Sequence, residues 1–370
     1  MGKLFSDQNV NSGRQPELDL AKCSAIFFMI FLHCYFVTAG FANEISLAME
    51  RAVAHLLGGP FAAPVFMTAM GIGMAYSKHQ APGLMVKRGI KLMLLGLVVN
   101  VGEFLLPHFV AGKLLGEWDI FPTAGGLLLF CIDILAFAGM AFILVGVLKK
   151  LNVSSRGMVI IALILSIAGW LLRNHDFGSN VPNLIAGYFI GSAGGFTAFP
   201  LFNWFIFPAA GHLFGEYYIR CNNKKKLLCL WPLGLVISVA YFVISWFRPE
   251  GFLTDAHHYY FMTTIDAMFC LMCVYGVIGA CYLAARHLSD GPLRFFSKTS
   301  SNVNAIYIIQ WFLIPLTYIF IVFFNRDIVF GDLSLIIIGL LEMAASTALA
   351  AWYKNMKKKY KEEKENEKKQ

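Results

Sequence analysis

Apolar residues in this chain occur in long runs, and most of the charged residues lie in the short segments between them. Each run is close to the roughly 20 residues that an α-helix needs to cross about 30 Å of hydrocarbon. The pattern therefore predicts an all-α polytopic membrane protein with about ten transmembrane helices. The runs cover residues 18–40, 60–77, 84–106, 122–148, 156–173, 184–219, 226–247, 261–286, 302–324 and 332–353.

The sixth run is too long for a single span and is interrupted by glycine and proline. The interrupting residues are Gly187, Gly191, Gly194, Gly195 and Pro200. We predict a broken or re-entrant segment, 184–196, followed by the true sixth span, 199–219. Non-helical backbone is tolerated inside a membrane only where protein or a cavity shields it.

The placement of positive charge predicts the orientation of the chain. If the N-terminus is cytoplasmic, the cytoplasmic segments hold 25 of the 30 Lys and Arg residues, as the retention of positive charge on that side requires. We therefore expect both termini in the cytoplasm. We divide the chain into an N-terminal segment (1–17), one transmembrane domain (18–353) and a charged tail (354–370) that is solvated or touches lipid.

Composition excludes an ordinary soluble protein, because 58% of the residues are hydrophobic and only 14% are charged. The net charge of +8 follows from topology and from attraction to anionic cytoplasmic lipids, so we predict no nucleic-acid partner. The cysteines lie mostly within or beside apolar runs, which argues against a disulfide framework. Asp255, His257 and His258 lack a fourth ligand, so we predict no metal.

Ionisable residues inside a membrane are costly, and each is a candidate functional residue. His33, Asp133 and Glu342 fall in the middle-to-outer part of their predicted spans and can meet in one cavity. Four further residues are either functional or paired with neighbouring helices, and these are Glu103, His212, Glu216 and Asp266.

Two groups of basic residues lie at the cytoplasmic ends of spans. Lys22 precedes His33 by eleven residues, close to three helical turns, so both side chains face the same way. Arg88 and Lys91 lie three residues apart at the start of the third span. Clusters of basic side chains of this kind bind phosphate groups well. The alternative is that these residues only set topology or extend to the membrane surface.

Several segments together resemble the transmembrane acyltransferases. Besides the first span, they are GGPFAAPVFMTAMGIGMAYS, RGIKLMLLGLVVN, IDILAFAGM and FPLFNWFIFPAAGHLFG, in that order. The likeness covers most of residues 14–320. It is strongest to the heparan-α-glucosaminide N-acetyltransferase-like branch, which is similar to the acyltransferase-3 family.

The resemblance implies a ten-helix core that passes an acyl group, usually acetyl, from cytoplasmic acyl-CoA to an outer acceptor, usually a sugar. It implies that His33 and Asp133 are catalytic, and that Lys22, Arg88 and Lys91 bind the CoA donor. Lys22 and Lys91 stand where acyltransferase-3 members have Arg. They keep the positive charge but lack the planar guanidinium that makes two hydrogen bonds to one phosphate. We expect acetyl-CoA or another acyl-CoA, a glycan and membrane lipids as partners, in a bacterial cell membrane, and leave a homo-oligomer open.

The residues support two hypotheses of mechanism. In the first, His33 removes a proton from an acceptor hydroxyl or amine, or first takes the acyl group, while Asp133 orients the imidazole ring. In the second, His33, Asp133, Asp266 and Glu342 form the relay of a proton-coupled transporter or flippase. The basic cytoplasmic clusters and the absence of a visible internal repeat favour the acyltransferase.

Overall fold

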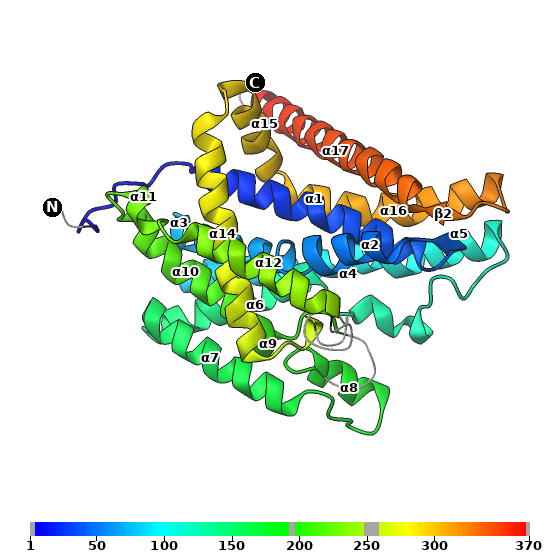
Figure 1. Cartoon of the computed structure of the whole chain (residues 1–370), viewed down its shortest axis with the longest axis horizontal. Coiled ribbons are helices and arrows are strands. Elements are labelled where there is room, and N and C mark those ends of the chain that lie inside the picture. The colour runs from blue at the N-terminus through cyan, green and yellow to red at the C-terminus, as the bar shows by residue number, and fades with distance from the viewer. Residues whose placement is uncertain (1–3, 192–196, 248–258, 368–370) are drawn as a thin grey trace.

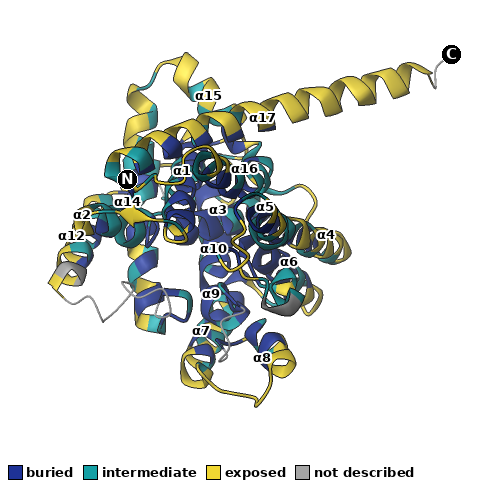
Figure 2. Cartoon of the chain, turned by 90° about the vertical axis from the view of Figure 1, so that its right-hand side faces the viewer, coloured by how far each residue is buried: buried dark blue, intermediate teal, exposed yellow. Residues whose placement is uncertain are grey.

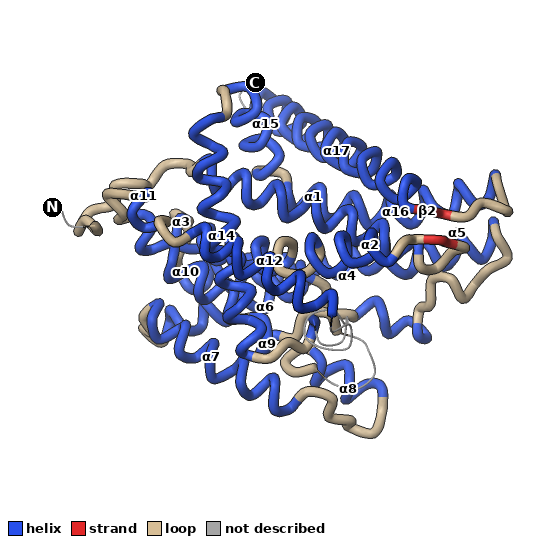
Figure 3. Tube along the Cα trace, viewed as in Figure 1, coloured by secondary structure: helices blue, strands red, loops and turns tan. Residues whose placement is uncertain are grey.

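The computed structural model is a bundle of helices with two short strands at one end (Figures 1 and 3). It describes residues 4–191, 197–247 and 259–367. The helices of the first half are α1 (Pro16–Thr38), α2 (Leu47–Glu50), α3 (Ala63–Tyr76), α4 (Pro82–Asn100), α5 (Leu106–Leu114), α6 (Ile134–Lys150) and α7 (Ser155–Leu172). Those of the second half are α8 (Asn180–Gly187), α9 (Leu201–Trp204), α10 (Ile206–Ile219), α11 (Lys224–Leu227), α12 (Trp231–Phe247), α14 (Thr264–His287), α15 (Asp290–Ser300), α16 (Val303–Phe324) and α17 (Asp332–Glu367).

Three helical segments with other hydrogen-bond patterns lie between these α-helices. They are the π-helices η1 (Arg51–Leu57) and η2 (Val101–Leu105) and the 3-10 helix η3 (Ala124–Phe130). The strands β1 (Asn43–Glu44) and β2 (Phe330–Gly331) pair in parallel. Because η2 and η3 lie inside predicted spans, they change where the side chains of those spans point.

Seven helical segments within the described residues are long and apolar enough to cross a membrane. They are Pro16–Thr38, Pro82–Leu114, Ser155–Leu172, Lys224–Ile244, Thr264–His287, Val303–Phe324 and Asp332–Glu367. The three other predicted spans contain shorter helices, since α3, α6 and α10 have 14, 17 and 14 residues. The chain is an integral multi-pass membrane protein, and the count of ten spans stays a prediction.

The peripheral helices carry exposed apolar side chains, as a lipid-facing surface requires. On α7 these include Ile160, Ile164 and Leu171, and on α12 they include Val236 and Val239. In Figure 2 the buried residues gather on the central helices, among them α1, α3 and α10. The centre of the bundle therefore holds the helix that carries His33.

The first and last long helices of the chain, α1 and α17, lie side by side. The paired strands place the end of α1 beside the start of α17, and the two helices pack against each other in opposite directions (Figure 1). The end of α17 extends beyond the body of the bundle (Figure 2). The location of both termini in the cytoplasm stays a prediction.

Close helix packing at glycine brings α4 against α6. A Cβ atom added to Gly89 would lie 2.5 Å from the carbonyl oxygen of Gly139, and one added to Gly139 would lie 2.5 Å from that of Gly89. Only residues without a side chain permit this approach. It places the Arg88 guanidinium 4.5 Å from the centre of the Phe142 ring.

Several predicted boundaries differ from the structure. The predicted fourth span, 122–148, is not one helix, because η3 precedes α6 and Asp133 lies at the N-cap of α6. The interruption of the sixth run is present, since α8 ends at Gly187 and helix resumes at Leu201, although residues 192–196 lie outside the described ranges. Helix α17 continues without a break across the predicted boundary between 353 and 354.

Candidate active site

Two cavities follow each other along the same helices. The larger, of about 540 Å³, is lined by residues of α1, α3, α4, α6, α16 and α17 and of the turn before α16. We call it the cationic cavity. The smaller, of about 70 Å³, surrounds His33, and we call it the histidine cavity. On α6, Leu135 lines the first and Ile134 the second, and on α16 Ala305 lines the first and Tyr307 the second. The two linings are therefore no more than about one helical turn apart.

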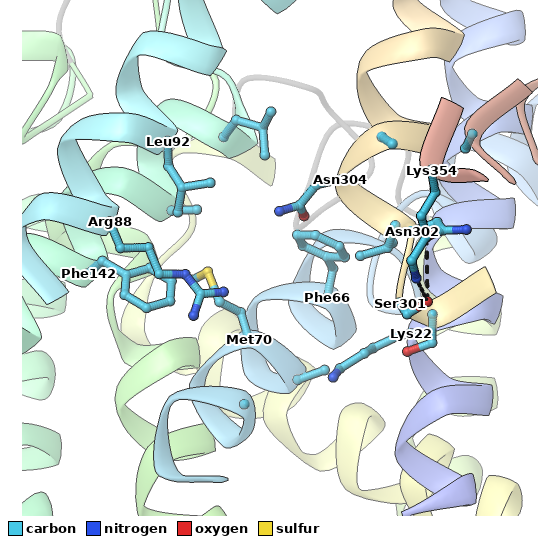
Figure 4. A pocket seen from close by; sticks show the side chains of 18 of the residues that line it. Lys22, Phe66, Met70, Arg88, Leu92, Phe142, Ser301, Asn302, Asn304 and Lys354 are labelled. Atoms are coloured by element: carbon cyan, nitrogen blue, oxygen red, sulfur yellow. Dashed lines mark hydrogen bonds between the residues drawn. The ribbon is translucent and has the colours of Figure 1, made fainter. Parts of the chain in front are cut away.

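The cationic cavity concentrates positive charge. Its lining holds Lys22, Arg88, Lys354 and Lys357 and no acidic residue. In Figure 4, Arg88 and Lys354 approach it from opposite sides. Four uncompensated cations in one hollow favour a ligand with several negative charges, such as a phosphate-bearing cofactor.

Each labelled cation is held differently. Arg88 stacks over Phe142, an arrangement that orients a guanidinium without using its N–H donors. Lys354 Nζ donates a hydrogen bond to Ser301 Oγ at 2.7 Å. Lys22 has no hydrogen bond or ion pair to another described residue, and its nearest acid, Asp19, is bonded to Arg14 at 2.5 Å. The Lys22 charge is therefore available to a ligand.

The structure brings together two of the three residues that the sequence assigns to cofactor binding. Lys22 and Arg88 line the cationic cavity, whereas Lys91 is exposed on α4 and does not line it. Lys354 and Lys357 line it but were assigned to the tail. The sequence contains one signal of this position, because Lys354 and Lys357 share a helical face with the apolar Ala350. In the structure Ala350 is fully buried.

The imidazole of His33 is buried and held by aromatic rings. It stacks on the Trp311 ring with 4.1 Å between centroids and a 26° interplanar angle, and it meets Tyr307 edge-on at 5.9 Å. His33 Nδ1 is buried and has no hydrogen-bond partner among the described residues. Ring packing thus fixes the imidazole while leaving one nitrogen for a substrate.

A chain of hydrogen bonds connects α16 to Asp133. Trp311 Nε1 donates to Tyr307 Oη at 3.0 Å, and Tyr307 Oη donates to Asp133 Oδ2 at 2.5 Å. Asp133 was expected to orient the His33 ring, but its side-chain hydrogen bond is to Tyr307, and the ring packs on Trp311. Asp133 is therefore connected to the His33 ring through Tyr307, which contacts that ring edge-on and also accepts a hydrogen bond from Trp311. Tyr307 and Trp311 were not among the predicted site residues, and their only signal in the sequence is a pair of polar-tipped aromatics four residues apart on an apolar helix.

Asn100 positions the segment that carries Asp133. This side chain is only 1% exposed at the end of α4, and its Nδ2 donates to the carbonyl oxygens of Leu129 and Cys131, both at 2.8 Å. The two bonds satisfy backbone groups at the junction of η3 and α6. They stabilise the non-helical junction between η3 and α6, which lies beside the histidine cavity.

The acidic residues around His33 differ from those expected. The sequence allowed His33, Asp133 and Glu342 to meet in one cavity, but Glu342 does not line the histidine cavity and accepts a hydrogen bond from Thr317 at 2.5 Å. Glu103 lines it instead, with a buried Oε2 that has no described partner. Glu103 belongs to η2, and a π-helical turn redirects side chains relative to a regular helix.

Two other candidate residues have local structural roles. Asp266 forms a capping box with Thr263 at the start of α14. His212 Nδ1 lies 3.0 Å from Ser155 Oγ and 3.8 Å from Glu216 Oε1. Neither Asp266 nor His212 lines the histidine cavity.

No group of three or more His, Cys, Asp or Glu side chains suited to a metal occurs among the described residues. Asp255, His257 and His258 lie outside those residues. The histidine cavity also contains Cys131, one of the free cysteines.

Residues 15–353 match the family model described as an acyltransferase domain. The chain belongs to the acyltransferase-3 family. This match confirms the resemblance at family level and makes the protein a membrane acyltransferase. The heparan-α-glucosaminide N-acetyltransferase-like branch stays a prediction. No curated protein and no solved structure matches the chain.

Proposed function

We propose that this acyltransferase moves an acetyl group from cytoplasmic acetyl-CoA to an extracytoplasmic glycan. The observation that carries the proposal is the succession of the two cavities along shared helices. CoA combines phosphates at one end with a thin arm and a thioester at the other. A cation-lined cavity followed by a small histidine cavity matches that order of groups.

The donor end of the proposal rests on Lys22 and Arg88. A cavity of about 540 Å³ lies within the range of small-molecule sites. Its phosphate partners would be the unpaired Lys22 ammonium and the oriented Arg88 guanidinium. Phe66 and Leu135 supply apolar lining for the arm that leads to His33.

The size of the histidine cavity favours a short acyl group. At about 70 Å³ it has room for only a few non-hydrogen atoms. Trp311, Tyr307 and Phe199 are among the side chains that enclose it. An acetyl group suits this space, whereas a long fatty acyl chain does not.

The chemistry assigns the proton transfers to His33. An imidazole nitrogen takes the proton of the acceptor hydroxyl or amine while the acceptor atom attacks the thioester carbonyl. The C–S bond breaks, and the departing CoA sulfur recovers the proton from the imidazolium. In the alternative, a His33 nitrogen attacks the thioester carbonyl and the C–S bond breaks to release the CoA thiolate. The acceptor then attacks the acetyl-imidazole, the C–N bond breaks, and the acceptor proton passes to the CoA thiolate. In both routes, Asp133 keeps Tyr307 and Trp311 in place around the ring.

The transporter hypothesis receives less support from the contacts. A relay through His33, Asp133, Asp266 and Glu342 requires neighbouring groups, yet Asp266 and Glu342 have local partners away from the histidine cavity. The proposal that the acceptor is a glycan rests on the family resemblance.

The test uses purified full-length protein in lipid nanodiscs with radiolabelled acetyl-CoA. We expect saturable binding and release of free CoA, with label passing to a glycan fraction added as acceptor. Folded protein that binds no acetyl-CoA would overturn the proposal. Proton flux in sealed proteoliposomes without acetyl-CoA consumption would support the transporter instead.

A further inference from the structure

We propose that the cytoplasmic part of α17 belongs to the donor site and recognises the ribose 3′-phosphate of CoA through Lys354 and Lys357. The inference rests on the proposed function and assigns a phosphate-binding role to residues that the sequence places in a solvated tail. The ligand chemistry is a phosphate monoester on a nucleotide.

The first support is the helical stripe that faces the cationic cavity. Ala350, Tyr353, Lys354 and Lys357 all line it, with the spacing i, i+3, i+4 and i+7 that defines one face of a helix. Ala350 is fully buried, so this face is anchored in the bundle before the helix extends outward. The two lysines are therefore fixed to the body of the protein.

The second support is the contact between Lys354 and the turn that precedes α16. Lys354 Nζ donates to Ser301 Oγ, and Asn302 of the same turn and Asn304 in the first turn of α16 also line the cavity (Figure 4). A cation held in place before binding loses less side-chain entropy when a phosphate arrives. Ser301, Asn302 and Lys354 thus form a polar wall across the cavity from Arg88.

The third support is the order of groups along the helix axis. Helix α17 runs away from the paired strands, in the opposite direction to α1, and Lys357 is about 4.5 Å beyond Lys354 along it. The histidine cavity lies in the opposite direction. A donor whose thioester reaches His33 therefore presents its far end, the nucleotide, to these lysines. The partly exposed Tyr353 ring adds a surface on which an adenine can stack.

Nearby lysines of α17 serve as internal controls. Lys358 and Lys359 are the next two residues after Lys357, and neither lines the cavity. Lys358 pairs with Glu362 at 3.5 Å. Removing this pair of charges changes the net charge of the tail equally without touching the cavity.

The experiment compares CoA with 3′-dephospho-CoA, using full-length protein in nanodiscs. Wild-type protein should bind CoA at least about tenfold more tightly, as expected for a charge-assisted phosphate contact. The double variant Lys354→Gln/Lys357→Gln should lose this preference while binding dephospho-CoA within about twofold of wild type. The control Lys358→Gln/Lys359→Gln should keep the preference. Unchanged dephospho-CoA binding also reports that the double variant is folded.

Other results would overturn the inference. Equal affinity of the wild type for the two forms of CoA, or equal losses in the two double variants, removes the role of Lys354 and Lys357. Nanodiscs with and without phosphatidylglycerol separate the nucleotide from a lipid headgroup as the source of phosphate. A lysine effect that needs the anionic lipid and is the same for both CoA forms assigns the lysines to lipid instead. Wild-type protein that binds neither form contradicts the proposed function itself.

Discussion

The cationic cavity and the histidine cavity divide binding from chemistry. The cationic cavity is the wider of the two, and three of its four cationic side chains are exposed. The second is small, with a buried imidazole, two carboxyl groups and a set of aromatic rings. Exposed cations attract a charged ligand and tolerate water, whereas proton transfer benefits from fixed groups in a site with little water.

The comparison teaches where each kind of side chain can be placed. Charge at the open end costs little because water and ligand phosphates solvate it. Polar groups near His33 must find partners inside the protein, which explains the chain from Trp311 through Tyr307 to Asp133. Substitutions in the two cavities should therefore affect different kinetic quantities.

The largest expected effect comes from His33→Ala. The turnover number for acetyl transfer should fall by at least about 100-fold, since a positioned general base contributes about that much or more. Acetyl-CoA affinity should stay within about twofold, because His33 lies outside the cationic cavity. Steady-state transfer and equilibrium binding measure the two quantities. His79→Ala, at an exposed loop position, is the control. Full activity of His33→Ala contradicts the assignment.

Arg88→Ala should act on the other side of the comparison. Losing a charged contact to phosphate should weaken acetyl-CoA binding by about tenfold or more, with turnover at saturation changed little. Lys91→Ala should weaken it by less than about twofold, because Lys91 does not line the cavity and exposed charges contribute little. Binding isotherms for both variants decide the point. A similar loss at both positions would favour the pair expected from sequence.

Tyr307→Phe tests the support of the histidine cavity. Removing the hydroxyl takes a donor from Asp133 and an acceptor from Trp311, and turnover should fall by about tenfold, the equivalent of one good hydrogen bond. Tyr318→Phe also removes a buried hydroxyl, which is bonded to Thr38 outside this cavity. It should leave turnover near wild type. If both variants slow transfer equally, Tyr307 acts only through stability.

Asp266→Asn should give the smallest effect. The capping box with Thr263 would be weakened, and the free energy of unfolding should fall by about 1 kcal/mol or less. Acetyl transfer should stay near wild type, because Asp266 does not line the histidine cavity. Thermal unfolding and transfer assays on the same preparation measure both. Loss of activity in a protein of normal stability would return Asp266 to a proton relay.

Parts of the site were within reach of the sequence. Lys22 and His33 were placed along one helix by their spacing, and the structure puts them in successive cavities. Arg88 joins Lys22 in the cationic cavity, and Asp133 joins His33. The spacing of Lys22 and His33 follows from the geometry of one helix, and the family resemblance assigned Arg88 and Asp133 to the same site.

Other parts were not predictable from apolar runs. A hydropathy pattern registers how apolar a segment is and cannot detect the π-helical turn that holds Glu103 or the break before α6. That break depends on Asn100, which bonds to backbone about 30 residues later in the chain. The sequence could not decide the position of Glu342 for the same reason, since only helix packing decides which face of α17 meets α16.

The sequence alone determined that this is a multi-pass membrane protein of helices, that its basic residues gather at particular span ends, and that it belongs with the acyltransferases. Continuous apolar runs and ordered motifs carry that information because membrane insertion and helix formation are local. Only the tertiary structure decided which charged residues share a cavity. It brought Lys354 and Lys357 into the same cavity as Arg88, left Lys91 outside that cavity, and placed Glu103 rather than Glu342 near His33. These outcomes depend on how close two helices approach and which turn departs from regular geometry, and both are set by contacts between distant parts of the chain.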